Sequence, residues 1–216
     1  MKIQVNRLHH PVTALGPGTR AGIWVQGCSI GCRGCISRDT WEPHEDAATE
    51  VDDVLGWLRA LPVDRVEGVT ISGGEPFDQP DALRELTAGL AAWREERRGT
   101  VDVFCYSGYS LARLRRRHPE ILAALDAAMT GPYRADLPTD LIWRGSANQE
   151  LVPLSPLGER RYRDQVENRP QRPPLQAVVE LDAIRLIGVP RGGDIGDLTE
   201  KLAAAGVDLG TSSWQS

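Results

Sequence analysis

Short apolar runs alternate with amphipathic helical segments between residues 21 and 133. We expect strands over residues 21–26, 66–72 and 101–107, where apolar or β-branched residues predominate, and a fourth strand or turn within 124–133. Helices are expected over residues 51–61, 81–98 and 110–117, and Pro119 begins a further short helix. This alternation predicts an α/β fold whose parallel strands are joined by right-handed crossovers.

Each conspicuous motif follows one of the predicted strands. CSIGCRGC, residues 28–35, comes after the first, GGEP, residues 73–76, after the second, and YSGY, residues 106–109, completes the third. Ligands of parallel sheets gather beyond the carboxyl ends of the strands. The sequence therefore predicts one site to which all three motifs contribute.

Three of the four cysteines lie within eight positions, as Cys28, Cys32 and Cys35. A chain of 216 residues buries about 70% of the surface that its unfolded form exposes, so it needs no disulfide framework. The loop spans at most roughly 25 Å when extended, and its glycines allow it to curl round a bulky inorganic group. The remaining cysteine, Cys105, is expected to be a buried strand residue.

Two kinds of metal centre suit this cysteine loop. Structural zinc requires four ligands, and one of His9, His10 or His44 would have to supply the fourth. A ferredoxin-type cluster uses four cysteines at a different spacing. Three thiolates on a cubane cluster would leave one iron open, and an open iron is a place to bind a substrate.

The segment GIWVQGCSIGCRGCISRDTW, with ISGGEP and CYSGYS after it, resembles the radical S-adenosylmethionine superfamily, and within it the activating enzymes of anaerobic ribonucleotide reductase and their single-cluster relatives. The resemblance implies a partial (β/α) barrel of parallel strands. It also implies that Cys28, Cys32 and Cys35 hold a [4Fe-4S] cluster whose open iron chelates S-adenosylmethionine. Beyond these cofactors it supplies no separate catalytic side chain.

The same resemblance assigns the contacts to S-adenosylmethionine. From the residue types, Gly73 and Gly74 should let the backbone approach a ligand, and Glu75 offers an acceptor to a cation. Asn148 and Gln149 either line the substrate opening or fasten a polar turn. Ile36 stands where the activating enzymes often carry an aromatic residue, and Arg33 replaces a frequent proline. The expected cofactor-binding residues are Gly34, Ile36, Ser72, Gly73, Gly74, Glu75, Pro76 and Ser107.

Residues 1–216 are expected to form a single domain, with residues 150–216 as a C-terminal extension. The extension should contain a proline-rich loop over 167–176, a hairpin that turns at Leu181 and Asp182, and a final helix. We expect Asp194 to cap that helix and Gly206 to end it.

The resemblance implies reductive cleavage of S-adenosylmethionine to a 5′-deoxyadenosyl radical, which would install a glycyl radical on a partner enzyme. Direct modification of a peptide or small metabolite is the alternative, and a non-catalytic zinc or iron–sulfur module is the second. The expected partners are a protein substrate and a low-potential electron donor of the flavodoxin or ferredoxin type.

The net charge is −5, which disfavours nucleic acid as a partner. No apolar run is long enough for a secretory signal or a membrane span, so we expect a cytoplasmic protein without membrane contact. Arg113, Arg115, Arg116 and Arg117 form either a solvated helix face or a docking patch.

Overall fold

A computed structural model describes residues 1–96, 100–181, 183–207, 210 and 212. A seven-stranded sheet forms its centre, with the strand order β3-β1-β2-β4-β5-β6-β7. The four inner strands β2, β4, β5 and β6 run parallel to one another, whereas β1 and β7 pair antiparallel with them. The strands are β1 (Lys2–Val12), β2 (Arg20–Val25), β3 (Ala48–Glu50), β4 (Gly68–Gly73), β5 (Asp102–Ser107), β6 (Ala127–Thr130) and β7 (Glu150–Pro153).

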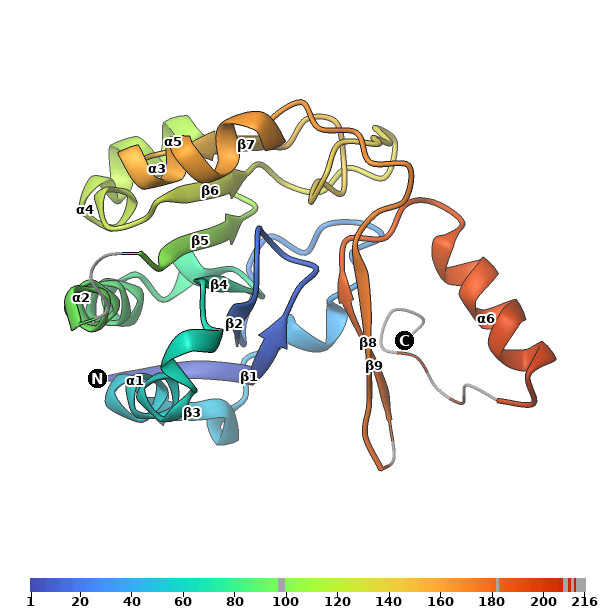
Figure 1. Cartoon of the computed structure of the whole chain (residues 1–216), viewed down its shortest axis with the longest axis horizontal. Coiled ribbons are helices and arrows are strands. Elements are labelled where there is room, and N and C mark those ends of the chain that lie inside the picture. The colour runs from blue at the N-terminus through green and yellow to red at the C-terminus, as the bar shows by residue number, and fades with distance from the viewer. Residues whose placement is uncertain (97–99, 182, 208–209, 211, 213–216) are drawn as a thin grey trace.

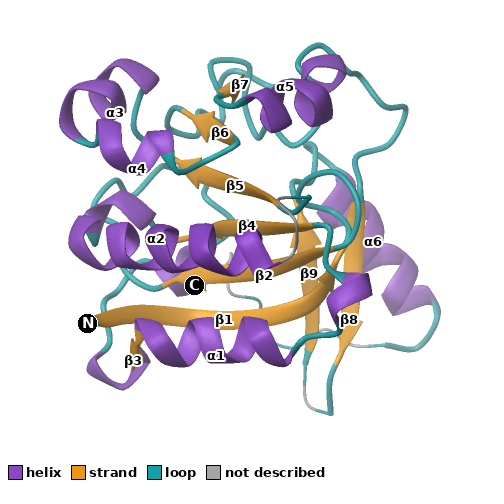
Figure 2. Cartoon of the chain, turned by 60° about the vertical axis from the view of Figure 1, so that its left-hand side comes forward, coloured by secondary structure: helices purple, strands orange, loops and turns teal. Residues whose placement is uncertain are grey.

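Helices α1 to α4 cover one face of this sheet, as Figure 2 shows. They are α1 (Val51–Ala60), α2 (Pro80–Glu96), α3 (Leu111–Arg117) and α4 (Pro119–Ala123). Their apolar sides pack against alternate strand residues, including Ile23, Ile71 and Val103, in one continuous core. Alternation along a strand sends the intervening residues to the opposite face, where Phe104 packs against Tyr162 of α5 (Pro156–Tyr162).

The predicted α/β class and parallel strands are confirmed, and each helix expected before residue 124 is present. Ser110 caps α3 by accepting a hydrogen bond from the Arg113 backbone N–H at 3.4 Å. The helix expected over 81–98 is described from Pro80 to Glu96, and residues 97–99 lie outside the described ones. The strand β1 was not predicted, because polar residues interrupt its apolar positions and most of its side chains are only half-buried.

The first part of the C-terminal extension forms β7 and α5, and its later part forms a hairpin and a helix at the carboxyl ends of the parallel strands (Figure 1). The predicted hairpin is confirmed as β8 (Leu175–Val179) paired antiparallel with β9 (Ile184–Gly188); Asp182 in its turn lies outside the described residues. Gln176 fixes the hairpin to the end of β1 by donating to the Pro11 carbonyl at 2.8 Å and accepting from the Thr13 N–H at 3.0 Å.

The final helix, α6 (Asp194–Ala204), is followed by Gly206 with a positive φ of 79°, as expected. The prediction for Asp194 was wrong. Gly193 occupies the capping position, and Asp194 is the first helical residue. Its carboxylate instead accepts a hydrogen bond from the Arg191 N–H at 2.7 Å, so it closes the turn before the helix.

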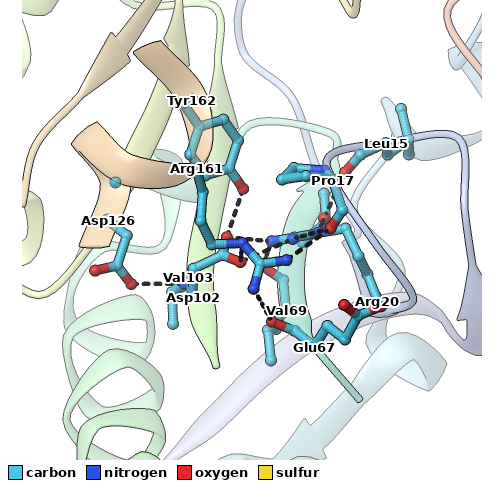
Figure 3. Close-up of polar contacts among 12 residues, drawn as sticks. Leu15, Pro17, Arg20, Glu67, Val69, Asp102, Val103, Asp126, Arg161 and Tyr162 are labelled. Atoms are coloured by element: carbon cyan, nitrogen blue, oxygen red, sulfur yellow. Dashed lines mark hydrogen bonds and ion pairs between the residues drawn. The ribbon is translucent and has the colours of Figure 1, made fainter. Parts of the chain in front are cut away.

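A buried ion pair joins the amino-terminal ends of β2 and β5 (Figure 3). The Arg20 and Asp102 side chains have no exposed surface, and Arg20 Nη2 lies 2.7 Å from Asp102 Oδ2. Arg20 also donates to Thr70 Oγ1 and to the carbonyls of Val69 and Pro17. Asp102 is further contacted by Arg161 Nε at 3.0 Å and by the Tyr162 hydroxyl at 2.5 Å. This network ties α5 to the sheet at the end remote from the three motifs.

Across the described residues, the structure contains no helix of the length and apolarity that a bilayer span requires.

Candidate functional site

The loops that follow β2, β4 and β5 converge on one cavity of about 880 Å³. Cysteines Cys28, Cys32 and Cys35 line it, each as a half-buried free thiol. Of the eight expected cofactor contacts, seven line the same cavity: Gly34, Ile36, Ser72, Gly73, Gly74, Glu75 and Ser107. Pro76 does not. It is buried at the start of a 3-10 turn, η4 (Pro76–Asp78), where it sets the exit of the loop.

The glycines of GGEP line the cavity and also let two loops approach each other closely. A Cβ on Gly73 would lie 2.4 Å from the Val25 carbonyl oxygen, and one on Gly74 would lie 2.1 Å from that of Gly27. The close approach allows two backbone hydrogen bonds, both 2.9 Å long. The Gly74 N–H donates to the Val25 carbonyl, and the Glu75 N–H donates to the Gly27 carbonyl. On the side of the missing Cβ atoms, GGEP therefore closely approaches the backbone that begins the cysteine loop.

Alanine at position 74 should consequently disturb the cysteine loop. The added Cβ cannot coexist with the Gly27 carbonyl, so we expect Gly74→Ala to lower the free energy of unfolding by about 2 kcal/mol and to reduce the iron bound after anaerobic reconstitution. The matched control is Gly56→Ala in α1, where a Cβ meets no atom within 4 Å and where alanine should stabilise the helix by about 0.5–1 kcal/mol. Urea unfolding and iron analysis measure both effects. Full iron loading at wild-type stability in Gly74→Ala would contradict the loop contact.

Glu75 connects the second and third motifs from a buried position. Its side chain is 1% exposed. Oε1 accepts hydrogen bonds from the Phe77 N–H at 3.0 Å and the Ser107 hydroxyl at 2.8 Å, and Oε2 accepts one from the Gly108 N–H at 2.7 Å. Burial raises the pKa of this carboxyl to about 7. A carboxylate offers roughly four acceptor positions, so one on Oε2 remains for a ligand.

The raised pKa of Glu75 predicts a pH dependence of stability in the metal-free protein. Because the folded form holds the proton more tightly than the unfolded form, the stabilisation is complete below pH 4.5 and is lost as pH rises through about 7. The loss should approach about 3 kcal/mol between pH 5 and 8, and Glu75→Gln should remove it. Urea unfolding across this range measures the difference, with the exposed Glu95→Gln as control. Parallel curves for wild type and Glu75→Gln would contradict it.

A second set of contacts fastens the cysteine loop from outside, and the sequence did not indicate it. The Ser29 N–H donates to Asp78 Oδ2 at 2.7 Å, and the Tyr109 hydroxyl donates to Asp78 Oδ1 at 2.6 Å. The Ser29 and Tyr109 hydroxyls lie 3.1 Å apart. Asp78 lies two residues after the second motif, and Tyr109 is the last residue of the third. Their closeness in sequence to the motifs was the only local signal that could have indicated them.

The remaining predicted residues have structural partners. Gln149 lines the cavity. Its side-chain amide accepts hydrogen bonds from the Gly145 and Ser146 N–H groups and donates one to the Gly131 carbonyl, so it stabilises a turn. Asn148 likewise donates to the Pro132 carbonyl. The interpretation of Cys105 as a buried strand residue is confirmed: its thiol is fully buried in the core, and burial raises its pKa well above the ordinary value.

Three half-buried thiols in one cavity are the type of donor that iron–sulfur clusters use. Among the residues that the structure describes, no three His, Cys, Asp or Glu side chains lie close enough together to hold one metal ion. His10 lies toward the other end of the sheet, where its Nε2 is 3.1 Å from the Arg65 carbonyl oxygen. Burial raises the pKa of both the Cys28 and the Cys32 thiol, so binding a metal group here must release protons.

The family model described as "4Fe-4S single cluster domain" matches residues 14–152. The chain belongs to this 4Fe-4S single cluster domain family. It is 32% identical over 136 residues to the anaerobic ribonucleoside-triphosphate reductase-activating protein of Enterobacteria phage T4. The matched region covers 63% of this chain and 85% of that protein. The protein of the same name from Escherichia coli K12 is 30% identical over 148 residues, 65% of this chain and 93% of its own.

Among solved structures, QueE from Escherichia coli matches with a TM-score of 0.41 and 21% identity over 51% of this chain and 54% of that chain. The predicted place of this 4Fe-4S single cluster protein in the radical S-adenosylmethionine superfamily is confirmed, and so are its cofactors, a [4Fe-4S] cluster and S-adenosylmethionine. The hairpin and α6 lie beyond the matched residues.

Proposed function

We propose that this chain is an activating enzyme that cleaves S-adenosylmethionine and removes a hydrogen atom from a backbone glycine of a partner protein. The observation that carries the proposal is the cavity in which three cysteine thiols meet the backbone of GGEP and the end of β5. A cluster held by the three thiols would supply the electron for reductive cleavage of S-adenosylmethionine, the chemistry that removal of a hydrogen atom requires.

We assign the cluster to Cys28, Cys32 and Cys35, which leaves one of four irons without a protein ligand. The free acceptor position on Glu75 Oε2 suits the cationic amino group of S-adenosylmethionine, because it lies in the same cavity beside Gly108. Gly34, Ile36, Ser72, Gly73, Gly74 and Ser107 would contribute the remaining contacts, with Pro76 holding the GGEP loop in shape. The protein's task is to orient the ligand and to keep water from the radical.

For the partner, we propose an anaerobic ribonucleotide reductase, since the relatives bear the name of its activating protein. The partner's glycine would lose one hydrogen atom and retain the unpaired electron. An external low-potential carrier, for which a flavodoxin or ferredoxin is a suitable type, must supply the electron, and we place the reaction in the cytoplasm.

Direct modification of a peptide or small metabolite is a second candidate, and one observation favours it. The β8–β9 hairpin lies outside the family match yet lines the cavity through residues such as Ile184, Leu186 and Ile187. Ile187 and Val178 pack with Leu15 and Trp24. A wall of this kind would give a small substrate an enclosed pocket.

One anaerobic experiment separates the two candidates. The reconstituted protein is reduced with dithionite and given S-adenosylmethionine together with the purified anaerobic reductase from the same cell. We expect 5′-deoxyadenosine to form and the reductase to acquire a glycyl radical signal in electron paramagnetic resonance. Formation of 5′-deoxyadenosine with a modified low-mass compound and no protein signal would favour the second candidate. Absence of 5′-deoxyadenosine under all conditions would refute both.

A further inference from the structure

Exposed arginines lie in the cysteine loop and on α3, the helix that begins just after the third motif. Arg33 belongs to the loop, and Arg113, Arg116 and Arg117 lie on α3; we call the three on α3 the arginine surface. Within the described part of the chain, none of them forms an ion pair. Unpaired positive charge at this place contrasts with the net charge of −5 of the whole chain.

The arginine surface is connected to the cysteine loop by direct contacts. The guanidinium carbon of Arg113 lies 3.6 Å from the centre of the Tyr109 ring. The Tyr109 hydroxyl lies 3.1 Å from the hydroxyl of Ser29, the residue that follows Cys28. Two non-covalent steps therefore lead from Arg113 to the residue beside a cluster ligand. Arg116 and Arg117 follow Arg113 by three and four positions, which places them on the adjoining side of the same helix.

The outer side of the cysteine loop is itself open to solvent. Ser29, Gly31 and Arg33 are exposed, whereas the cysteines beside them are half-buried. The cysteines also line the cavity, together with the GGEP loop and the C-terminal hairpin. The loop that would hold the cluster is therefore accessible from solvent on this side.

We propose that the arginine surface is the docking site of an acidic electron-carrier protein that reduces the cluster. This inference rests on the proposed function, which requires an external electron. In the docked pair, the reduced carrier loses one electron and the oxidised cluster gains it, and no atom changes place. Negative charge on the carrier would be drawn to the arginines, which raises the rate of encounter and orients the carrier toward the loop.

The test compares a charge-reversed surface with a matched charge-reversed control. The variant carries Arg113→Glu, Arg116→Glu and Arg117→Glu; the control carries Arg59→Glu, Arg65→Glu and Arg160→Glu, which are exposed elsewhere and change the net charge equally. A second variant with only Arg116→Glu and Arg117→Glu leaves the contact between Arg113 and Tyr109 intact. Each protein is reconstituted, and its iron content is confirmed before use.

Two readouts are taken with reduced, acidic flavodoxin as the probe: its Kd for each protein by titration, and the rate of cluster reduction by stopped-flow absorbance. At low ionic strength we expect both surface variants to be reduced about 10-fold or more slowly than the control and to bind more weakly. The difference should shrink as salt screens the charges. Dithionite needs no docking, so with it all proteins should cleave S-adenosylmethionine at the wild-type rate.

Equal flavodoxin binding and equal reduction rates in the surface variants and the control would overturn the docking site. A variant that is slow with dithionite as well would also overturn it, because the arginines would then act on the cluster itself. If wild type fails to cleave S-adenosylmethionine with dithionite, the proposed function is refuted. The docking site is then still decided by the flavodoxin titration, which requires no cleavage.

Discussion

Replacing any one of Cys28, Cys32 and Cys35 by alanine is expected to reduce cleavage of S-adenosylmethionine to background. The three thiols line one cavity. Two remaining thiolates cannot hold three irons of a cubane cluster. The measurements are iron and sulfide per chain after anaerobic reconstitution, with about four of each expected for wild type, and 5′-deoxyadenosine formed under dithionite.

Cys105→Ala is the control for these three variants. Its thiol lies in the core among the residues that pack between the sheet and its helices, and its burial leaves no path to the cavity. The change should remove packing worth about 1 kcal/mol while iron content and cleavage stay at the wild-type level. A Cys28, Cys32 or Cys35 variant that retains the full cluster would contradict the ligand assignment, and so would loss of the cluster in Cys105→Ala.

The parallel centre of the fold was predictable because its information is local. Each inner strand is a short apolar run, and each crossover helix places its buried residues at helical spacing, as Val51, Val54, Leu55 and Leu58 do in α1. The carboxyl ends of such strands must share one edge of the sheet. The meeting of the three motifs therefore followed from the order of elements alone, without any knowledge of side-chain contacts.

The contacts that shape the site were not predictable in the same way, because they join residues far apart in the chain. Ser29 and Asp78 are separated by 49 positions, and Ser29 and Tyr109 by 80. No local pattern distinguishes these polar residues from exposed ones. The GGEP glycines show the same limit: the residue types indicate a close approach of the backbone, but only the fold shows that Gly74 also approaches Gly27.

The buried pair of Arg20 and Asp102 also escaped prediction, and it carries the largest expected effect on stability. An arginine and an aspartate at strand starts resemble ordinary surface residues in sequence. In the structure both side chains are fully buried, and each has several further partners. Burial of two charges is tolerated only where the geometry and the additional hydrogen bonds compensate for lost hydration.

Asp102→Asn is expected to lower the free energy of unfolding by about 3–5 kcal/mol, because it leaves the guanidinium of Arg20 buried without a counter-charge. Arg20→Met should lower the free energy of unfolding by a similar amount, because it leaves the Asp102 carboxylate buried without Arg20. Arg161, whose Nε lies 3.0 Å from Asp102 Oδ1, would compensate in part. The double variant Arg20→Met with Asp102→Asn should lose less than the sum of the two single losses, since it removes both charges of the pair. Urea unfolding of all four proteins gives the coupling energy directly.

The exposed pair of Arg134 and Asp136 provides the control, and Asp136→Asn should leave stability within experimental error. The Arg20 network lies at the amino-terminal ends of β2 and β5, whereas the cysteine loop and Ser107 lie at their carboxyl ends. Any variant that remains folded at low temperature should therefore bind iron normally. Additive losses in the double variant would contradict the coupling of Arg20 with Asp102. Loss of the cluster in a folded Asp102→Asn protein would show that the two ends of the sheet are not independent.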